Sequence, residues 1–236
     1  MRFCHFALPL VALATACSDS NPLAPDQGST SDSEIVAVVA LRAADFSSGA
    51  HATVNVENNG IQTNLDPDGS DLSIRADSDG FFRMGRLFAG SDANAVSRYT
   101  LEAPGLPIST YSTQDAAFPD EGSNPHDILR VNDEKAYVMR YGSPRLWVVN
   151  PNAEAEIGFY QGEVDLGAFD SDGVPDMTTG VLAAGRAWVV LQRLTFFSAE
   201  QESMIVAIDL ATDSIVDLDP STCLLYTSPS PRDLST

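Results

Sequence analysis

Cysteine is almost absent from this chain. Its three cysteines are Cys4, Cys17 and Cys223, and none lies between residues 34 and 222. Small exported domains that lack a large hydrophobic core usually depend on disulfide bonds. This distribution excludes such a framework, so the folded part is expected to depend on a packed core.

Basic residues are also scarce. The 13 lysines and arginines face 33 acidic residues, which gives a net charge of −20 at pH 7. An acidic surface of this kind argues against binding to nucleic acid and against electrostatic attraction to anionic lipid. It is compatible with an outward-facing domain that attracts divalent cations.

Several familiar signatures are missing. The sequence contains no Gly-x-Ser-x-Gly elbow, no phosphate-binding loop and no paired-cysteine metal motif. It also lacks an amphipathic helical pattern. Nucleophilic catalysis therefore has no support from motifs, and the pattern predicts an all-β protein.

A repeated unit organises the region between Asn124 and Asp209. Each copy combines a Pro-containing entry, a strand with a central aromatic residue, and a strand that ends in Asn or Asp. The equivalent pairs are Pro125 and Pro175, Tyr137 and Trp188, and Asn150 and Asp209. Short strands repeated at about 40 to 50 residues, each unit too small to bury its own core, are typical of a β-propeller.

The strand pattern predicts four-stranded antiparallel blades, about three of them, preceded by an N-terminal hairpin. The hairpin strands are expected at residues 34–41 and 52–57, with a turn at Asn58–Gly60. The blade strands are expected at 71–75, 81–87, 95–101 and 107–113, then 126–131, 136–141, 145–150 and 155–160, then 178–183, 187–194, 204–210 and 214–218. The aromatic residues Phe82, Tyr137, Trp147 and Trp188 are interpreted as packing between blades.

Two strings within the repeat resemble a known family. Ala136-Tyr-Val138 followed by Leu146-Trp-Val-Val-Asn150 is similar to the YVTN-type repeat of seven-bladed β-propellers, and Ile205-Val-Ala-Ile-Asp209 matches its second half. Met139-Arg140 departs from the motif where the family has Thr-Asn. The resemblance covers about residues 34–220 and implies a bacterial propeller lipoprotein, truncated, without specifying an activity.

The N-terminus has the layout of a secretory signal. A positive charge at Arg2 precedes the apolar stretch Ala7–Ala14, and small residues lead to Cys17. This resembles a lipobox, so residues 1–16 are expected to be a lipoprotein signal peptide and Cys17 the lipidated residue. The Ser- and Asp-rich residues 17–33 are expected to form a disordered tether. An ordinary signal peptide with an incidental Cys17 is the alternative.

The C-terminus has no pattern related to the repeat. Cys223–Asp233 resembles the translation of a transposase-type sequencing adapter. Residues 223–236 are therefore expected to be a non-native tail, and residues 34–222 a partial β-propeller. The alternative is a natural tail rich in Pro and Ser.

Acidic loops are the first candidate sites. Carboxylates gather beside a glycine at 66–71, 77–80 and 170–176, and calcium prefers six to eight oxygen ligands. Asp170, Asp172 and Asp176 are the best calcium candidates, although no loop has the EF-hand spacing. Asp and Gly are also ordinary turn residues, so both interpretations stay open.

A second candidate site lies where innermost strands begin, because propellers commonly bind ligands at the mouth of the central channel. The sequence places a channel-mouth ligand site at His126, Asp127, Arg140, Asp176 and Gln192. His126 could bind metal or act as a base, but no second histidine supports a cluster. Structural roles for these residues are the alternative.

The favoured hypothesis is a lipid-anchored, non-enzymatic binding module at the bacterial envelope, at the outer membrane or cell surface. Its ligand would be a protein, a polymer or a small molecule, and the protein is expected to be a monomer that binds no nucleic acid. No catalytic residue or organic cofactor is predicted. The alternative is a lactonase-like propeller hydrolase with a metal ion in the central channel.

Overall fold

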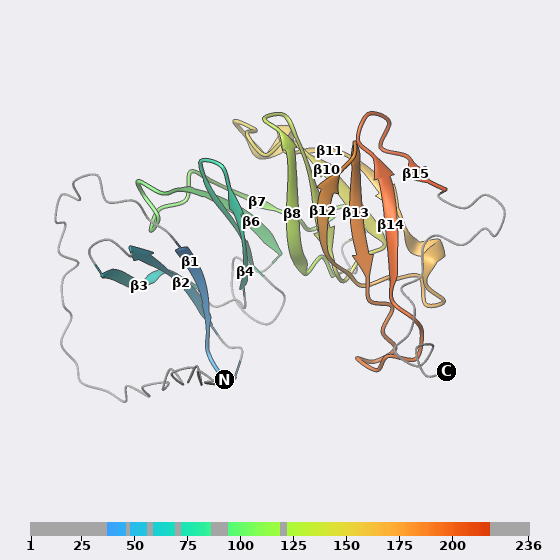
Figure 1. The fold of residues 1–236 in the computed structure, drawn as a ribbon, viewed down its shortest axis with the longest axis horizontal. Coiled ribbons are helices and arrows are strands. Elements are labelled where there is room, and N and C mark those ends of the chain that lie inside the picture. Colours follow the sequence, from blue (N-terminus) through green and yellow to red (C-terminus); the bar gives the residue numbers. More distant parts are fainter. Residues whose placement is uncertain are drawn as a thin grey trace, which may run out of the picture. The chain divides into compact units, whose positions relative to one another are not determined.

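The computed structural model describes residues 37–45, 48–55, 59–68, 72–85, 94–118 and 122–217. The expected signal peptide, Cys17, the tether and the tail 223–236 lie outside these residues. The described chain is all-β, with two short 3₁₀ turns, and its strands form four antiparallel sheets (Figure 1). No helix among these residues has the length and apolar character needed to cross a membrane.

The first sheet contains β1 (Ala37–Arg42), β2 (Gly49–Asn55) and β3 (Gly60–Asp68), in that order. The expected hairpin is present, and β3 adds a third strand to it. The segment of β3 lacks β-branched alternation and contains Asp66 and Pro67, which favoured a loop interpretation. Positive φ angles at Asn64 and Asp66 accompany the shifts of register between β2 and β3.

The second sheet is the divergent first blade. Its strands are β4 (Leu72–Asp77), β5 (Gly80–Gly85), β6 (Ala95–Thr100) and β7 (Ser109–Ser112), each paired with the next along the chain. The close pairing of β5 with β6 needs a glycine, because a Cβ at Gly80 would lie 2.0 Å from the Tyr99 carbonyl oxygen. All four strands agree with the predicted blade.

The third sheet is the blade with the clearest repeat. It contains β8 (Pro125–Asn132), β9 (Lys135–Arg140), β10 (Arg145–Val149) and β11 (Tyr160–Asp165). The outer strand predicted at 155–160 is wrong, because that segment contains a 3₁₀ turn at Glu156–Gly158 and the outer strand is β11. The alternating sequence before Tyr160 favoured a strand, but the chain turns there before β11 begins. A second 3₁₀ turn, Gly167–Phe169, follows β11.

The fourth sheet contains β12 (Met177–Ala183), β13 (Arg186–Leu191), β14 (Met204–Asp209) and the two-residue edge strand β15 (Ile215–Val216). In every sheet, consecutive strands are neighbours, which is the meander arrangement of propeller blades. The predicted fold class is therefore confirmed: an all-β, incomplete propeller of four-stranded antiparallel blades.

Apolar layers join the sheets. Phe82, Met84 and Tyr111 of the second sheet pack against Val138 and Trp147 of the third. A second layer lies between the third and fourth sheets. It includes Leu129, Tyr137, Met139, Leu146, Ala187, Val189, Val206 and Ile208.

Three of the four aromatic residues predicted to pack between blades are buried. Phe82 is 2% exposed, Tyr137 is 0% exposed and Trp147 is 5% exposed. Trp188 is only partly buried, because it lies on the face of the fourth sheet that points away from the third.

Candidate functional site

Asp127 connects the innermost strands of three sheets. It lies on β8 and is 6% exposed. Arg75 of β4 donates from Nε to Asp127 Oδ1 at 2.8 Å and from Nη2 to Oδ2, and the Thr179 hydroxyl of β12 donates to Oδ2 at 2.8 Å. A charge-assisted fork of this kind is stronger than a neutral hydrogen bond and fixes orientation. The second, third and fourth sheets therefore meet at one carboxylate.

The backbone completes the bonding of this carboxylate. The N–H of Ile128 donates to Oδ1 at 2.9 Å and the N–H of Gly180 donates to Oδ2 at 3.3 Å. Arg75 Nη2 also donates to the Gly180 carbonyl at 2.9 Å. An ionised carboxylate has about four acceptor sites, and these donors fill them. The hydrogen bonds of Asp127 therefore join the three sheets, and its oxygens are poorly placed to act as a base or to bind a metal ion.

Gly180 permits this close approach. A Cβ at that position would lie 2.6 Å from the Trp188 carbonyl oxygen and 2.9 Å from Met139 Cε. Any larger residue would clash with the backbone of β13 in its own sheet and with Met139 of the third sheet. The glycine in β12 is therefore explained by close approach within the fourth sheet and between the third and fourth sheets.

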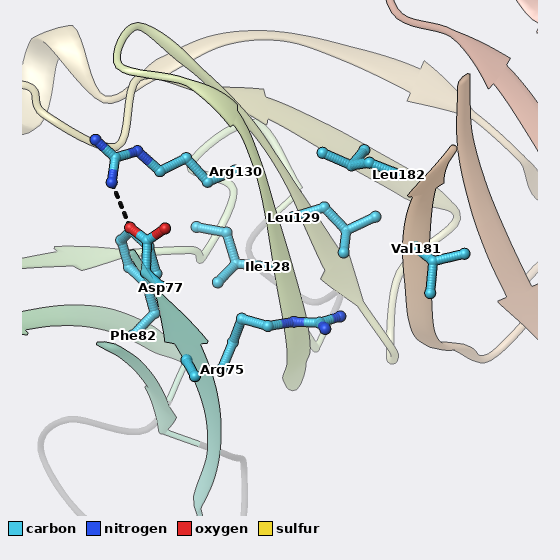
Figure 2. Close-up of a pocket in the computed structure, with 9 residues that line it drawn as sticks. Arg75, Asp77, Phe82, Ile128, Leu129, Arg130, Val181 and Leu182 are labelled. Atoms are coloured by element: carbon cyan, nitrogen blue, oxygen red, sulfur yellow. Dashed lines mark hydrogen bonds and ion pairs between the residues drawn. The ribbon is translucent and has the colours of Figure 1, made fainter. Parts of the chain in front are cut away.

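Two hollows flank the Arg75–Asp127 pair. The larger, of about 480 Å³, is lined by Ile74, Arg75, Ala76, His126, Asp127, Thr178 and Thr179. Figure 2 shows the smaller, of about 250 Å³, between β4, β8 and β12, with Phe82, Ile128, Leu129, Val181 and Leu182 among its apolar walls. Arg130 and Asp77 pair at its edge. Arg75 lines both hollows.

Polar donors remain available in the larger hollow. Within the described ranges, no residue accepts a hydrogen bond from Arg75 Nη1 or is bonded to the Thr178 hydroxyl. The Arg75 side chain is 33% exposed. Since the neighbouring carboxylate neutralises its charge, this wall presents hydrogen-bond donors without strong net charge.

The structure brings four of the five predicted channel-mouth residues to the leading end of the third and fourth sheets, the end where β8 and β12 begin. The His126 ring stacks on Tyr141, with centroids 4.2 Å apart. The Tyr141 hydroxyl donates to Gln192 Oε1 at 3.2 Å, and the Gln192 N–H donates to the Asp176 carbonyl at 3.1 Å. Burial and the negative charge of Asp176 raise the pKa of Tyr141. Asp127 lies beside His126 on β8.

Arg140 lies elsewhere. It is 0% exposed, and its guanidinium lies 4.3 Å from the centroid of the Trp147 ring. Its Nε donates to the Thr113 carbonyl at 3.0 Å, and its Nη1 donates to the Ser143 hydroxyl at 3.0 Å. This surrounding is the interior between the second and third sheets, so the structure does not bring Arg140 to the other candidates.

Two of the three calcium candidates accept hydrogen bonds from their own loop. Asp170 Oδ1 accepts from the Asp172 N–H at 3.2 Å and Asp172 Oδ1 accepts from the Val174 N–H at 2.8 Å, as is usual for Asp in turns. Asp176 Oδ2 instead accepts from the Leu194 N–H, in the segment after β13, at 2.7 Å. No group of three or more His, Cys, Asp or Glu in the described part is arranged to hold a metal ion. Calcium binding by these loops stays a prediction.

The acidic loop also fixes the insert at residues 193–203 between β13 and β14. Gln201 Nε2 donates to Asp170 Oδ1 at 3.0 Å, and Arg193 Nη2 donates to Gln201 Oε1 at 2.6 Å. Arg193 Nε lies 4.0 Å from Asp170 Oδ2. In Figure 1 the insert extends beyond the ends of β13 and β14. The Asp-rich sequence of this loop is therefore used to hold a neighbouring segment.

Two phenylalanines form the tip of this insert. Phe196 and Phe197 have φ angles of 48° and 63°, and Thr195 and Ser198 exchange backbone hydrogen bonds of 3.0 and 2.9 Å across them. Consecutive positive φ angles define a type I′ turn, which favours Asn-Gly. The side chains are 96% and 84% exposed, so burial does not offset the backbone strain.

Replacing Phe196 by Asn and Phe197 by Gly together is expected to raise the free energy of unfolding by about 2 kcal/mol, because both residues tolerate positive φ. Urea denaturation measures the change. A matched double variant with Leu at both positions keeps the strain and is expected to show no gain. An Asn-Gly variant no more stable than the wild type would contradict the prediction.

Asp176 should give the stability a distinct pH dependence. Burial raises the pKa of its carboxyl, the Leu194 N–H opposes this, and Asp172 and Asp170 raise it further. A raised pKa means that the folded protein binds the proton more readily than the unfolded chain. The charge therefore costs stability above the folded pKa, and the cost disappears as pH falls below the ordinary value.

The variant Asp176→Asn should consequently be more stable than the wild type at pH 7, with the difference vanishing in acid. Its amide oxygen can still accept from the Leu194 N–H. Urea denaturation across a pH series tests this, with Glu156→Gln, an exposed carboxyl, as the control. A variant whose advantage grows toward low pH would contradict the sign.

Comparisons with known proteins add little to this geometry. No protein-family model matches the chain, and no curated protein matches it. One solved structure with similarity is a Kuenenia stuttgartiensis hydrazine synthase, at 12% identity and a TM-score of 0.48. The match covers 81% of this chain and 51% of that one, so the chain spans about half of its length. Membership in the YVTN-type family stays a prediction.

Sequence reasoning did not find Arg75, Thr178 or Thr179. Arg75 belongs to the divergent first blade, where no motif marks it. The available signal was a single basic residue in the alternating strand Leu72-Ser-Ile-Arg-Ala-Asp77. A charge on an innermost strand needs a buried partner, and the sequence does not show that Asp127 would supply it.

Proposed function

We propose that this protein is a lipid-anchored, non-enzymatic propeller of the bacterial envelope that binds a small polar molecule in the larger hollow, the one lined by Arg75, His126 and Thr178. The supporting observation is the pairing of available donors on Arg75 and Thr178 with a carboxylate, Asp127, that is already saturated. Such a wall can orient a ligand without transferring a proton. A volume of about 480 Å³ falls within the usual range for small-molecule sites.

The hollow favours a ligand that carries hydrogen-bond acceptors. Both available groups can donate, and the charges of Arg75 and Asp127 compensate each other. The net charge of −20 disfavours polyanions. Carbonyl and hydroxyl oxygens of a neutral or weakly charged molecule would fit these conditions.

Thermal-shift measurements with defined probes test the binding proposal. Neutral oligosaccharides, amino acids and dicarboxylates are each added at millimolar concentration, and at least one class is expected to raise the Tm. Thr178→Val keeps the side-chain shape and removes the hydroxyl, so that probe should bind about tenfold more weakly. Thr63→Val, at an exposed position of β3, is the control. No shift with any class, or a shift unchanged in Thr178→Val, would overturn the proposal.

The proposal of a lipid anchor at Cys17 is based on the small residues Ala14-Thr-Ala16 that precede it. Metabolic labelling with radioactive palmitate in a bacterial host should label the wild type, and globomycin should block processing. Cys17→Ala should take up no label. A Cys17→Ala protein that is still labelled would exclude this residue as the anchor.

A further inference from the structure

The smaller hollow differs in chemistry from the larger one. Its apolar walls include Phe82, Ile128 and Leu129, which are 2%, 0% and 5% exposed, and Leu182, which is 38% exposed. Apolar surface that is open to solvent is stabilised when a nonpolar group covers it. The smaller hollow (Figure 2) therefore favours a nonpolar ligand group that contacts Leu182.

The two hollows are consecutive along the innermost strands, and together they form one groove. Arg75 and Ala76 of β4 line both of them. On β8, residues 126–127 line the larger hollow and residues 128–130 line the smaller one. On β12, the corresponding residues are 178–179 and 181–182. A ligand group in one hollow therefore lies directly beside the other hollow, with Arg75 between the two.

The basic residue at the edge of the smaller hollow is already paired. Arg130 Nη1 donates to Asp77 Oδ2 and, at 2.9 Å, to Asp79 Oδ1, and Arg130 Nη2 donates to Asp133 Oδ1 at 2.5 Å. Three carboxylates outweigh one guanidinium, so this edge disfavours an anionic group on a ligand. The available hydrogen-bond donors described above belong to the larger hollow. The polar groups that can orient a ligand therefore lie at one end of the groove.

The volumes of the two hollows set the size of the groups that fit. The smaller hollow, of about 250 Å³, exceeds the cavity of about 150 Å³ that holds benzene when it is lined by Leu, Ile and Phe. It therefore accommodates a short alkyl chain or one aromatic ring. The larger hollow, of about 480 Å³, accommodates a polar head group.

We infer that one amphipathic small molecule occupies both hollows. Its head carries hydrogen-bond acceptors and lies beside Arg75 and Thr178. Its uncharged alkyl or aryl tail packs against Ile128, Leu129 and Leu182. Such a division, with a few polar groups that orient the ligand and apolar walls that bind it, is usual for small-molecule sites. The inference rests on the proposed function, because the head occupies the site proposed there, and it adds the chemical class of the ligand.

Isothermal titration calorimetry of the full, unacylated chain with two series of probes tests the inference. One series is methyl, butyl and hexyl β-D-glucopyranoside, and the other is N-acetyl-, N-butanoyl- and N-hexanoylglycine, all kept below the concentrations at which they form micelles. Full burial of a methylene group strengthens binding about fourfold. Because the wall at Leu182 is partly exposed, the Kd is expected to fall about twofold per added methylene in at least one series.

Substitutions at Leu182 locate the tail. Leu182→Asn should remove most of the gain with chain length and leave the Kd of the shortest probe unchanged, because it makes this wall polar and leaves the larger hollow intact. Leu182→Ala should lose part of the gain, and it replaces the first variant if urea denaturation shows that one to be unfolded. Leu106→Asn, at a 70% exposed position that lines neither hollow, is the matched control. Thr178→Val should weaken every member of the series by the same factor of about ten.

The outcomes separate this inference from the proposed function. Binding that Thr178→Val weakens, but that does not tighten with chain length, would overturn the inference and leave the proposed function standing. A gain with chain length that persists in the Leu182 variants would also overturn the inference, because the tail would then lie elsewhere. If no probe shows binding that depends on Thr178, both the inference and the proposed function are wrong.

Discussion

Replacing Asp127 by alanine is expected to lower the free energy of unfolding by about 3 kcal/mol, the lower end of the cost of removing one partner from a buried ion pair, because the Arg75 side chain is 33% exposed. The carboxylate accepts from Arg75, Thr179 and two backbone N–H groups across three sheets. Its loss leaves the guanidinium without its counter-ion and leaves several hydrogen-bond donors without an acceptor. The substitution should therefore separate the innermost strands as well as remove one contact.

Urea denaturation followed by circular dichroism measures this effect. Asp172→Ala is the matched control, because that carboxylate is exposed and bonds only within its own loop. The control should lose less than about 1 kcal/mol. A loss of similar size for both variants would mean that Asp127 does not connect the sheets as described.

The second large effect is expected for Arg140→Met, which should destabilise the fold by about 3 kcal/mol. The guanidinium is fully buried, packs on Trp147, and donates to Thr113 and Ser143. Methionine fills much of the same space but leaves those acceptors without donors. Because Arg140 lies apart from the hollow, the affinity of any ligand bound beside Arg75 should not change.

Two measurements separate this structural role from a role at the channel mouth. The urea midpoint should fall, and the probe-induced rise in Tm should stay as large as in the wild type. Arg186→Met, at a partly exposed position on β13, should have little effect on either measurement. An Arg140→Met protein of normal stability that no longer responds to the probe would support the channel-mouth interpretation.

Much of the fold could be predicted because the repeat carries it. The alternation of β8 to β10 and β12 to β14, together with the Tyr137–Trp188 equivalence, placed these strands to within two or three residues. β3 was missed because Pro67 and its acidic neighbours are poor strand formers, and pairing with β2 overrides that local preference. The prediction placed the outer strand too early in the chain, because the alternating segment before β11 forms a 3₁₀ turn.

The candidate site was only partly predictable. Tyr141 connects His126 to Gln192 and Asp176, because equivalent positions in successive blades lie at the same end of their sheets, and a repeat reveals such positions. Arg140 begins a turn in the same way, yet its side chain points inward to Trp147. Sequence spacing fixes where a residue lies along a strand, but contacts between sheets decide which side chains become buried.

The meander order of the strands has a consequence for how the chain is made. Every strand pairs with the strand before or after it, so no sheet waits for a distant segment. Contacts of short sequence separation favour rapid folding, and domains generally fold as their segments emerge during synthesis. The strands of each blade can therefore pair as they are translated, and packing against the next blade then buries their apolar side chains. Arg75 would then gain its bonds to Asp127 when the third sheet is made, and Asp127 would gain the hydrogen bond from Thr179 when the fourth sheet is made.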